Sequence, residues 1–328
     1  MRRFACGVCA VEVAFTDAVC GACGSDLGYV PELGDIVPLR PAGGADYLID
    51  GPGGATGVWR CLNFAWGCNW VLAADSGAVW CASCRLTRGR PDASSPDAVA
   101  AWSVAEAAKR RLVHQLRSLG LPIGDEVKFD LVFLPESRGV TGHLPGVVTL
   151  DLREADDAYR EAARLHFGER DRTVLGHLRH EIGHHYWALL VERAGQLDAF
   201  RSVFGDERAD YANALAEHYD WLDRTVPDTH ISGYAAAHPS EDWAETFAHD
   251  LHLRDGLETA AAFGLVPAGW PGEAFADVLA RWRTVARAVG ELSLGLGHVA
   301  PYPFVITAPV AAKLALVHAL VAAAASAG

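Results

Sequence analysis

The stretch 173–192 carries the clearest hydrophobic pattern in the chain. Its aliphatic positions are Leu175, Leu178, Ile182, Leu189 and Leu190. Residues three and four apart lie on one face of a helix, so these side chains form an apolar stripe along it. No proline interrupts the stretch. The pattern therefore predicts an amphipathic helix with one face in the core.

Other helices are predicted on both sides of this one. They cover 95–120, 153–166, 206–222, 238–253 and the Ala-rich C-terminus. Ser95 and Pro96 are suited to the N-cap and the first position of one helix, and Ser240 can cap another. The C-terminal helix is expected to pack on the rest of the fold, with membrane association as the alternative.

Two strand-like runs, 127–134 and 146–152, predict strands ahead of the central helix. Strands followed by helices fit a small α+β domain. The exposed edge of such a sheet can hold an extended peptide through main-chain hydrogen bonds, and we expect 146–152 to do this.

Length and charge exclude some functions. The chain has 328 residues, of which 51% are hydrophobic and 21% are charged, enough for one large domain with appendages. A formal net charge of −13 argues against a general binder of nucleic acid or anionic membranes. The first residues are basic, but no apolar segment follows them, so we expect no secretory signal and a cytoplasmic protein. Its cysteines should then stay reduced unless they bind metal.

The thiol and imidazole side chains lie in separate parts of the chain. All eight cysteines fall between Cys6 and Cys84, whereas all fourteen histidines lie at or after His114. Because both residue types are metal ligands, this segregation predicts two kinds of metal site.

The cysteines form two sets with the spacing of zinc ligands. The sets are Cys6, Cys9, Cys20 and Cys23, and Cys61, Cys68, Cys81 and Cys84. The first has two C-x-x-C pairs and the second has one, and each set can offer four thiolates to a structural zinc ion. The alternatives are a disulfide or a redox pair for the first set. For the second they are pairing across the sets or free buried thiols.

These sites define two ribbon-like modules, at 1–30 and 59–90. The Gly- and Pro-rich stretch 31–58 is expected to be an irregular connection, and 91–328 a larger separate domain. Residues 1–90 hold seven Arg and no Lys against eight acidic residues, so the charge signature of a nucleic-acid module is missing. A structural role or contact with a protein partner is favoured for the ribbons.

The central helix carries the H-E-x-x-H pattern as His180, Glu181 and His184. Histidines four apart lie on one helix face and can bind one Zn²⁺, while the glutamate lies beside the metal, where it can act on a bound water. This is the geometry of a zinc-dependent peptidase; the alternative is a helix with incidentally spaced histidines. His177 and His185 fall outside the pair and are expected to form hydrogen bonds or pack.

A third protein ligand is needed, and two later helices offer candidates. In 206–222 these are Asp210, Glu217 and His218, although that helix is expected mainly to pack over the core with a solvated face. In 238–253, Glu241 and Glu245 share a face, while Trp243, Phe247 and Leu251 form a separate apolar stripe. One carboxylate can bind metal while the other orients a ligand histidine. Two solvated glutamates, or His249 as the ligand, are the alternatives.

The segment E-D-W-A-E-T-F, which begins at Glu241, seven residues after Tyr234, resembles the corresponding segment of gluzincin-type peptidases such as the anthrax lethal factor protease. That likeness covers the zincin core only. Through HEIGHHYW, SGY and EDWAETFAH, the whole chain is similar to a bacterial family named putative zinc-binding metallopeptidases, which joins zinc ribbons to an H-E-x-x-H domain. The resemblance implies that Glu241 is the third zinc ligand and that Tyr234 stabilises the transition state.

The sequence therefore predicts a mostly helical, zincin-like α+β peptidase domain with a small antiparallel or mixed sheet, preceded by two zinc ribbons. It would hold one catalytic and two structural zinc ions. Glu181 would act as general base on a zinc-bound water, and Tyr234 would hydrogen-bond the oxyanion unless it is only a packing aromatic. Two alternatives stay open: an inactive binding or regulatory protein, and a peptidase that its ribbons recruit to nucleic acid.

Overall fold

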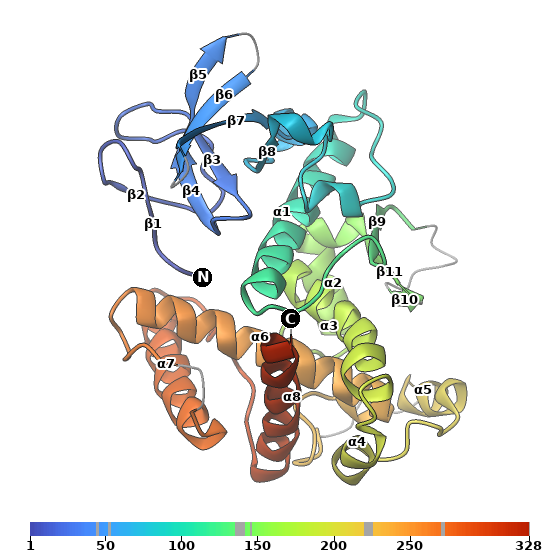
Figure 1. Ribbon diagram of the computed structural model, residues 1–328. Helices are drawn as coiled ribbons and strands as arrows, with labels where there is room; N and C mark the ends of the chain where they lie inside the picture. The colour runs from blue at the N-terminus through green and yellow to red at the C-terminus, as the bar shows by residue number, and fades with distance from the viewer. Residues whose placement is uncertain are drawn as a thin grey trace.

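The structure is a computed structural model with an α+β fold, in which small N-terminal sheets precede a helical part (Figure 1). It describes residues 1–43, 46–51, 54–134, 142–144, 146–219, 226–269 and 273–327. The long helix α1 (Pro96–Ser118) runs from the sheets toward the helical part. Ser95 occupies its N-cap position and Pro96 its first turn, as predicted, but the Ser95 side chain makes no capping hydrogen bond.

Antiparallel hairpins make up the N-terminal part. Two short ones pair β1 (Phe4–Ala5) with β2 (Glu12–Val13) and β3 (Leu27–Val30) with β4 (Asp35–Pro38). A four-stranded meander follows, with the order β5 (Arg40–Gly43), β6 (Asp46–Gly51), β7 (Gly54–Arg60) and β8 (Val71–Ala73).

The expectation of an irregular connection at 31–58 was therefore wrong. Strands β4 to β7 occupy most of this stretch and enclose a small core of their own. Ile49 and Val58 are buried there against Val30, Leu39 and Val71. The glycines and prolines of this stretch that the structure describes lie in and between paired strands, where main-chain hydrogen bonds hold the chain.

Aromatic rings join the ribbon part to α1. Phe15, Tyr29 and Trp70 pack together, and the Phe15 ring centroid lies 5.0 Å from that of His114 on α1. The Tyr29 hydroxyl lies 2.6 Å from Nδ1 of His114, whose Nε2 has no hydrogen-bond partner among the described residues. Burial lowers the pKa of His114 to about 4, because a charged imidazole is poorly solvated there.

This buried histidine should make folding stability depend on pH. Its folded-state pKa lies below the unfolded value, so its contribution is present above about pH 6.5 and is lost as pH falls toward 4. The expected loss is about 2 kcal/mol between pH 7 and pH 5. The free energy of unfolding of His114→Gln, measured with urea, should fall less between pH 7 and pH 5 than that of wild type. The same replacement at the exposed His298 should leave the pH dependence of wild type unchanged. Equal pH dependence in all three proteins would contradict the assignment.

A three-stranded mixed sheet follows α1. Its order is β10 (Gly142–Leu144), β11 (Val147–Asp151) and β9 (Lys128–Val132). Strand β11 runs parallel to β9 and antiparallel to β10, so both of its edges are paired. The expectation that 146–152 binds an extended peptide at an exposed edge is therefore contradicted, because β10 covers the edge that the prediction had left free.

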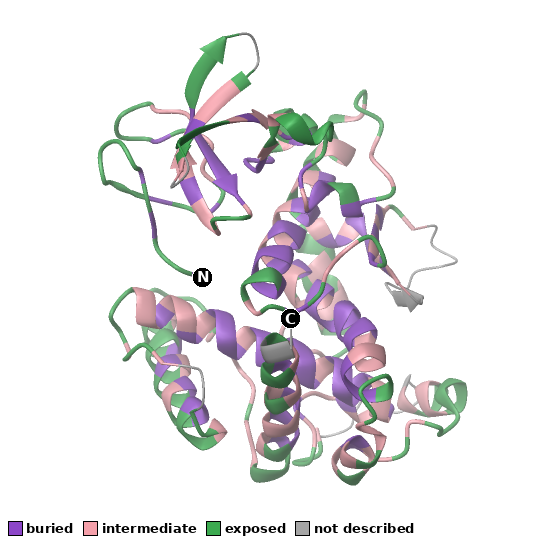
Figure 2. Ribbon diagram, in the orientation of Figure 1, coloured by how far each residue is buried: buried purple, intermediate pink, exposed green. Residues whose placement is uncertain are grey.

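The remaining chain is helical. Its elements are η5 (Leu152–Ala155), α2 (Asp157–His166), α3 (Val174–Trp187), the π-helical turn η6 (Ala188–Glu192), α4 (Leu197–Phe204), α5 (Tyr211–Tyr219), η7 (Tyr234–Ala236), α6 (Pro239–Ala262), α7 (Phe275–Gly295) and α8 (Ala308–Ala327). Helices α3 and α6 pack side by side at the centre of this part and are its most buried elements (Figure 2).

A glycine lets these two helices approach closely. A Cβ atom on Gly183 of α3 would lie 3.1 Å from the backbone of Ala244 on α6. Beside this contact Tyr186 stacks on Phe247, with ring centroids 5.2 Å apart, and the indole of Trp243 donates a hydrogen bond to the Gly183 carbonyl. The predicted apolar stripe of α6 is confirmed, because Trp243, Phe247 and Leu251 are fully buried.

Helix α8 is long and apolar enough to cross a membrane by length and composition. One side of it packs into the fold against α6, where Val310, Leu314, Val317 and Val321 are buried. This packing supports the prediction that the C-terminal helix belongs to the folded domain.

Candidate active site

Two histidines of α3 and one glutamate of α6 bring their donor atoms together. One ligand atom each from His180, His184 and Glu241 lies within 4.8 Å of the others. Oε2 of Glu241 lies 2.9 Å from Nε2 of His180 and 3.5 Å from Nε2 of His184. Two imidazole nitrogens and one carboxylate oxygen form the donor set of a catalytic zinc site with three protein ligands.

The ends of both helices fix this arrangement. The Thr173 hydroxyl caps α3 by accepting a hydrogen bond from the amide of Gly176. At α6 the predicted cap was wrong: His238 is the N-cap residue, and its Nδ1 accepts from the amide of Ser240. Ser240 instead lies inside the first turn, as does Glu241, where the positive end of the helix dipole favours a carboxylate.

Glu245 lies one turn after Glu241 and holds the other side of His180. Its Oε1 is 2.7 Å from Nδ1 of His180, and its Oε2 accepts a hydrogen bond from the Ser232 hydroxyl at 2.6 Å. Burial alone would raise the pKa of Glu245, but the contact with His180 brings it to about 2. Two ionised carboxylates therefore flank one imidazole, an environment that favours a positive charge at His180, from a proton or from a metal ion.

Glu181 and Tyr234 complete the predicted set. The Glu181 side chain is 5% exposed and has no hydrogen-bond or ion-pair partner among the described residues. Its carboxylate is not part of the donor group, which matches a role beside a metal rather than on it. The ring of Tyr234 lies 5.6 Å from that of His180, so its side chain borders the site.

One site residue was missed. The Tyr211 hydroxyl donates a hydrogen bond to Oε1 of Glu241 at 2.9 Å. Tyr211 begins α5, thirty positions before Glu241, and no local spacing connects the two. The only signal was its place in the acidic stretch that we had considered as a source of ligands.

The other candidate ligands lie outside the donor group. Asp210 accepts hydrogen bonds from Asn213 at the start of α5, and the ring of His218 packs against that of Tyr234. Glu217 lies on the same helix and is also absent from the group. His249 is buried, with its Nδ1 2.9 Å from the Tyr302 hydroxyl.

The two remaining histidines of α3 have the predicted roles. Nδ1 of His177 lies 2.8 Å from the buried carboxylate of Glu154, which Arg172 also contacts. His185 is buried, and its ring packs against that of Tyr186.

The eight cysteines gather into the two predicted sets of four, each with its sulfur atoms within 4.8 Å of one another. Sulfur atoms are 3.7 Å apart between Cys6 and Cys23 and 3.7 Å apart between Cys68 and Cys81. A zinc tetrahedron with bonds of about 2.3 Å has sulfur–sulfur edges of about 3.8 Å, whereas a disulfide needs about 2.05 Å. The thiols therefore fit zinc, and disulfides or pairing across the sets do not match the structure.

Comparison with known proteins agrees with this geometry. Residues 98–320 match the family described as putative zinc-binding metallo-peptidase. The chain belongs to this family. Residues 3–95 match a zinc-ribbon domain. Proteins of Mycobacterium tuberculosis and Mycobacterium bovis, both described as uncharacterized, are 39% identical over 98% of this chain and 95% of their own length. No solved structure shows significant similarity.

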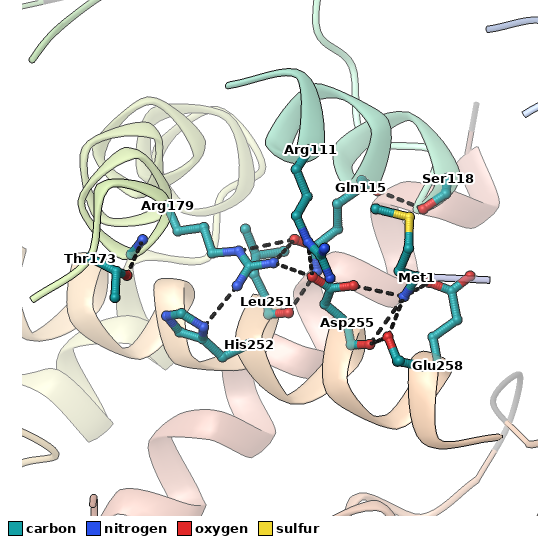
Figure 3. Close-up of polar contacts among 12 residues, drawn as sticks. Met1, Arg111, Gln115, Ser118, Thr173, Arg179, Leu251, His252, Asp255 and Glu258 are labelled. Atoms are coloured by element: carbon teal, nitrogen blue, oxygen red, sulfur yellow. Dashed lines mark hydrogen bonds and ion pairs between the residues drawn. The ribbon is translucent and has the colours of Figure 1, made fainter. Parts of the chain in front are cut away.

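A buried polar network ties the metallopeptidase helices α3 and α6 to α1 (Figure 3). Arg179, the residue before His180, donates hydrogen bonds to Oε1 of Gln115 on α1 and to Oδ2 of Asp255 on α6. Arg111 of α1 and the Met1 ammonium group contact the same Asp255 carboxylate. The ribbon part, α1 and both site helices therefore meet at one carboxylate.

Proposed function

We propose that the protein is a gluzincin-like zinc peptidase in which His180, His184 and Glu241 hold the catalytic ion. The observation that carries this proposal is the convergence of these three donors from two packed helices. Glu181, one residue after the first ligand, remains buried and unpaired among the described residues. A protein that used zinc only for structure would have no need of a free carboxylate at this place.

Zinc bound by three protein groups supplies Lewis acidity, which lowers the pKa of water and polarises a peptide carbonyl. The chain supplies the rest of the chemistry. Glu181 takes the proton of the attacking water and delivers it to the leaving amine. The Tyr234 hydroxyl donates a hydrogen bond to the developing oxyanion. Glu245 accepts a hydrogen bond from the Nδ1–H of His180, which would leave Nε2 of that ring to bind the metal.

The substrate is proposed to be a peptide or a protein, and the two cysteine sets to hold two structural zinc ions. The ribbons are proposed to stabilise the domain and to contact a protein partner. A cytoplasmic location suits eight cysteines that gather as free thiols in two zinc-like sets.

Zinc stoichiometry tests this proposal. Wild-type protein purified without added metal should contain about three zinc ions by elemental analysis, and Glu241→Ala about two, because two histidines alone hold the ion weakly. The matched control is Glu291→Ala, which changes an exposed glutamate of α7 and should retain all the zinc. About two ions in both wild type and Glu241→Ala would leave the histidine pair without metal and overturn the proposal.

A further inference from the structure

The two carboxylate oxygens of Glu241 have different partners. Oε2 faces the histidine nitrogens, 2.9 Å from His180 and 3.5 Å from His184. Oε1 accepts a hydrogen bond from the Tyr211 hydroxyl at 2.9 Å. Glu241 is 2% exposed, so few other groups can reach either oxygen. Tyr211 therefore contacts the carboxylate oxygen that does not face the two histidines.

Tyr211 is held in place by the same residue that caps α6. Its ring meets that of His238 edge-on, with centroids 5.2 Å apart. Nδ1 of His238 accepts from the α6 backbone, and its Nε2 lies 3.1 Å from the carbonyl of Ala209, two residues before Tyr211. The hydroxyl donor and the carboxylate that it contacts are thus both held next to His238, although Tyr211 as a residue is 44% exposed.

We propose that Tyr211 is a positioning residue that keeps Glu241 a one-oxygen ligand of the catalytic zinc. This inference rests on the proposed function. A carboxylate can bind a metal through one oxygen or both, and a catalytic zinc needs one coordination position left open. A hydrogen bond to Oε1 orients the carboxylate and occupies its second oxygen. It also restricts the Glu241 side chain before metal binds, so that binding costs less conformational entropy.

The side chains of Tyr211 and Tyr234 interact with each other, and we assign them separate tasks. Tyr211 contacts Glu241, whereas the ring of Tyr234 lies against His180 and carries the proposed contact with the oxyanion. Tyr211→Phe should therefore weaken zinc binding, while Tyr234→Phe should lower turnover and leave zinc affinity unchanged. This contrast separates positioning of a ligand from a contact with the reacting atoms.

The test measures zinc affinity of the catalytic site by competition with a chelator, on protein whose ribbons stay loaded. Tyr211→Phe should bind this zinc roughly 10- to 100-fold more weakly than wild type, the usual effect of losing a hydrogen bond to a metal ligand. Tyr159→Phe is the matched control, because Tyr159 on α2 is similarly exposed at 36% and lies outside the site. Its zinc affinity should equal that of wild type.

Co²⁺ in the catalytic site, with zinc kept in the ribbons, gives a second readout. Its visible spectrum reports coordination number, and in Tyr211→Phe it should shift toward the spectrum of a site with one more ligand. Equal zinc affinity and an unchanged Co²⁺ spectrum in Tyr211→Phe would overturn the inference and leave the proposed function standing. Wild-type protein without a third zinc ion would instead overturn the proposed function.

Discussion

Glu181→Gln should lower the rate of peptide hydrolysis by about 10²- to 10⁴-fold, the range for loss of a general base. Glutamine has nearly the same shape as glutamate but cannot accept a proton. Zinc content should not change, because Glu181 lies outside the group of donor atoms formed by His180, His184 and Glu241. The measurement pairs hydrolysis of a labelled, unfolded protein substrate with elemental analysis of the same preparation.

The control for this variant is Glu161→Gln, which changes an exposed glutamate of α2 and should keep wild-type activity. Identical purification of the three proteins also exposes any contaminating protease, since its activity would persist in Glu181→Gln. If Glu181→Gln keeps wild-type activity, and an inhibitor specific to this site still blocks that activity, then Glu181 has no part in the mechanism. Loss of activity together with zinc would mean that Glu181 supports the metal rather than the proton transfer.

Features encoded by local spacing could be predicted from the sequence. His180 and His184 are one helical turn apart, so any helix there places them on the same face. The C-x-x-C pairs form tight turns whose thiolates can meet whatever the rest of the fold does. The α+β class and the apolar stripe of α6 followed from periodicity in the same way.

Features that depend on pairing between distant segments were missed. Strands β6 and β7 were not predicted, because their sequence is rich in glycine. They are stabilised by pairing with each other and by the small core around Ile49 and Val58. Strand β11 was expected at an edge because nothing in its own residues shows that β10 pairs with it. Tyr211 and Glu241 are far apart in sequence and meet where His238 joins the residues before α5 to the start of α6.

Asp255→Asn should lower the free energy of unfolding by about 3–5 kcal/mol, the usual effect of removing one partner from a buried ion pair. The Asp255 carboxylate lies 2.8 Å from Arg179, 3.0 Å from Arg111 and 2.7 Å from the Met1 ammonium nitrogen. Burial alone would raise the pKa of Asp255, but these three cations hold it well below its ordinary value. Asparagine would leave the charges of Arg111 and Arg179 uncompensated, and Arg179 is only 2% exposed, whereas the Met1 ammonium group would keep its ion pair with Glu258.

Urea unfolding at neutral pH measures this effect, with Asp277→Asn on the exposed face of α7 as the control, expected to lie within about 0.5 kcal/mol of wild type. The folded-state pKa of Asp255 is depressed, so its contribution is present at neutral pH and is lost as the solution is acidified; the two proteins should converge in acid. A change no larger than that of the control would mean that water compensates the cations. A loss of the expected size in the free energy of unfolding would mean that this carboxylate joins the ribbon part to the helix that carries His180. Removal of the ribbons should then also weaken the metal site.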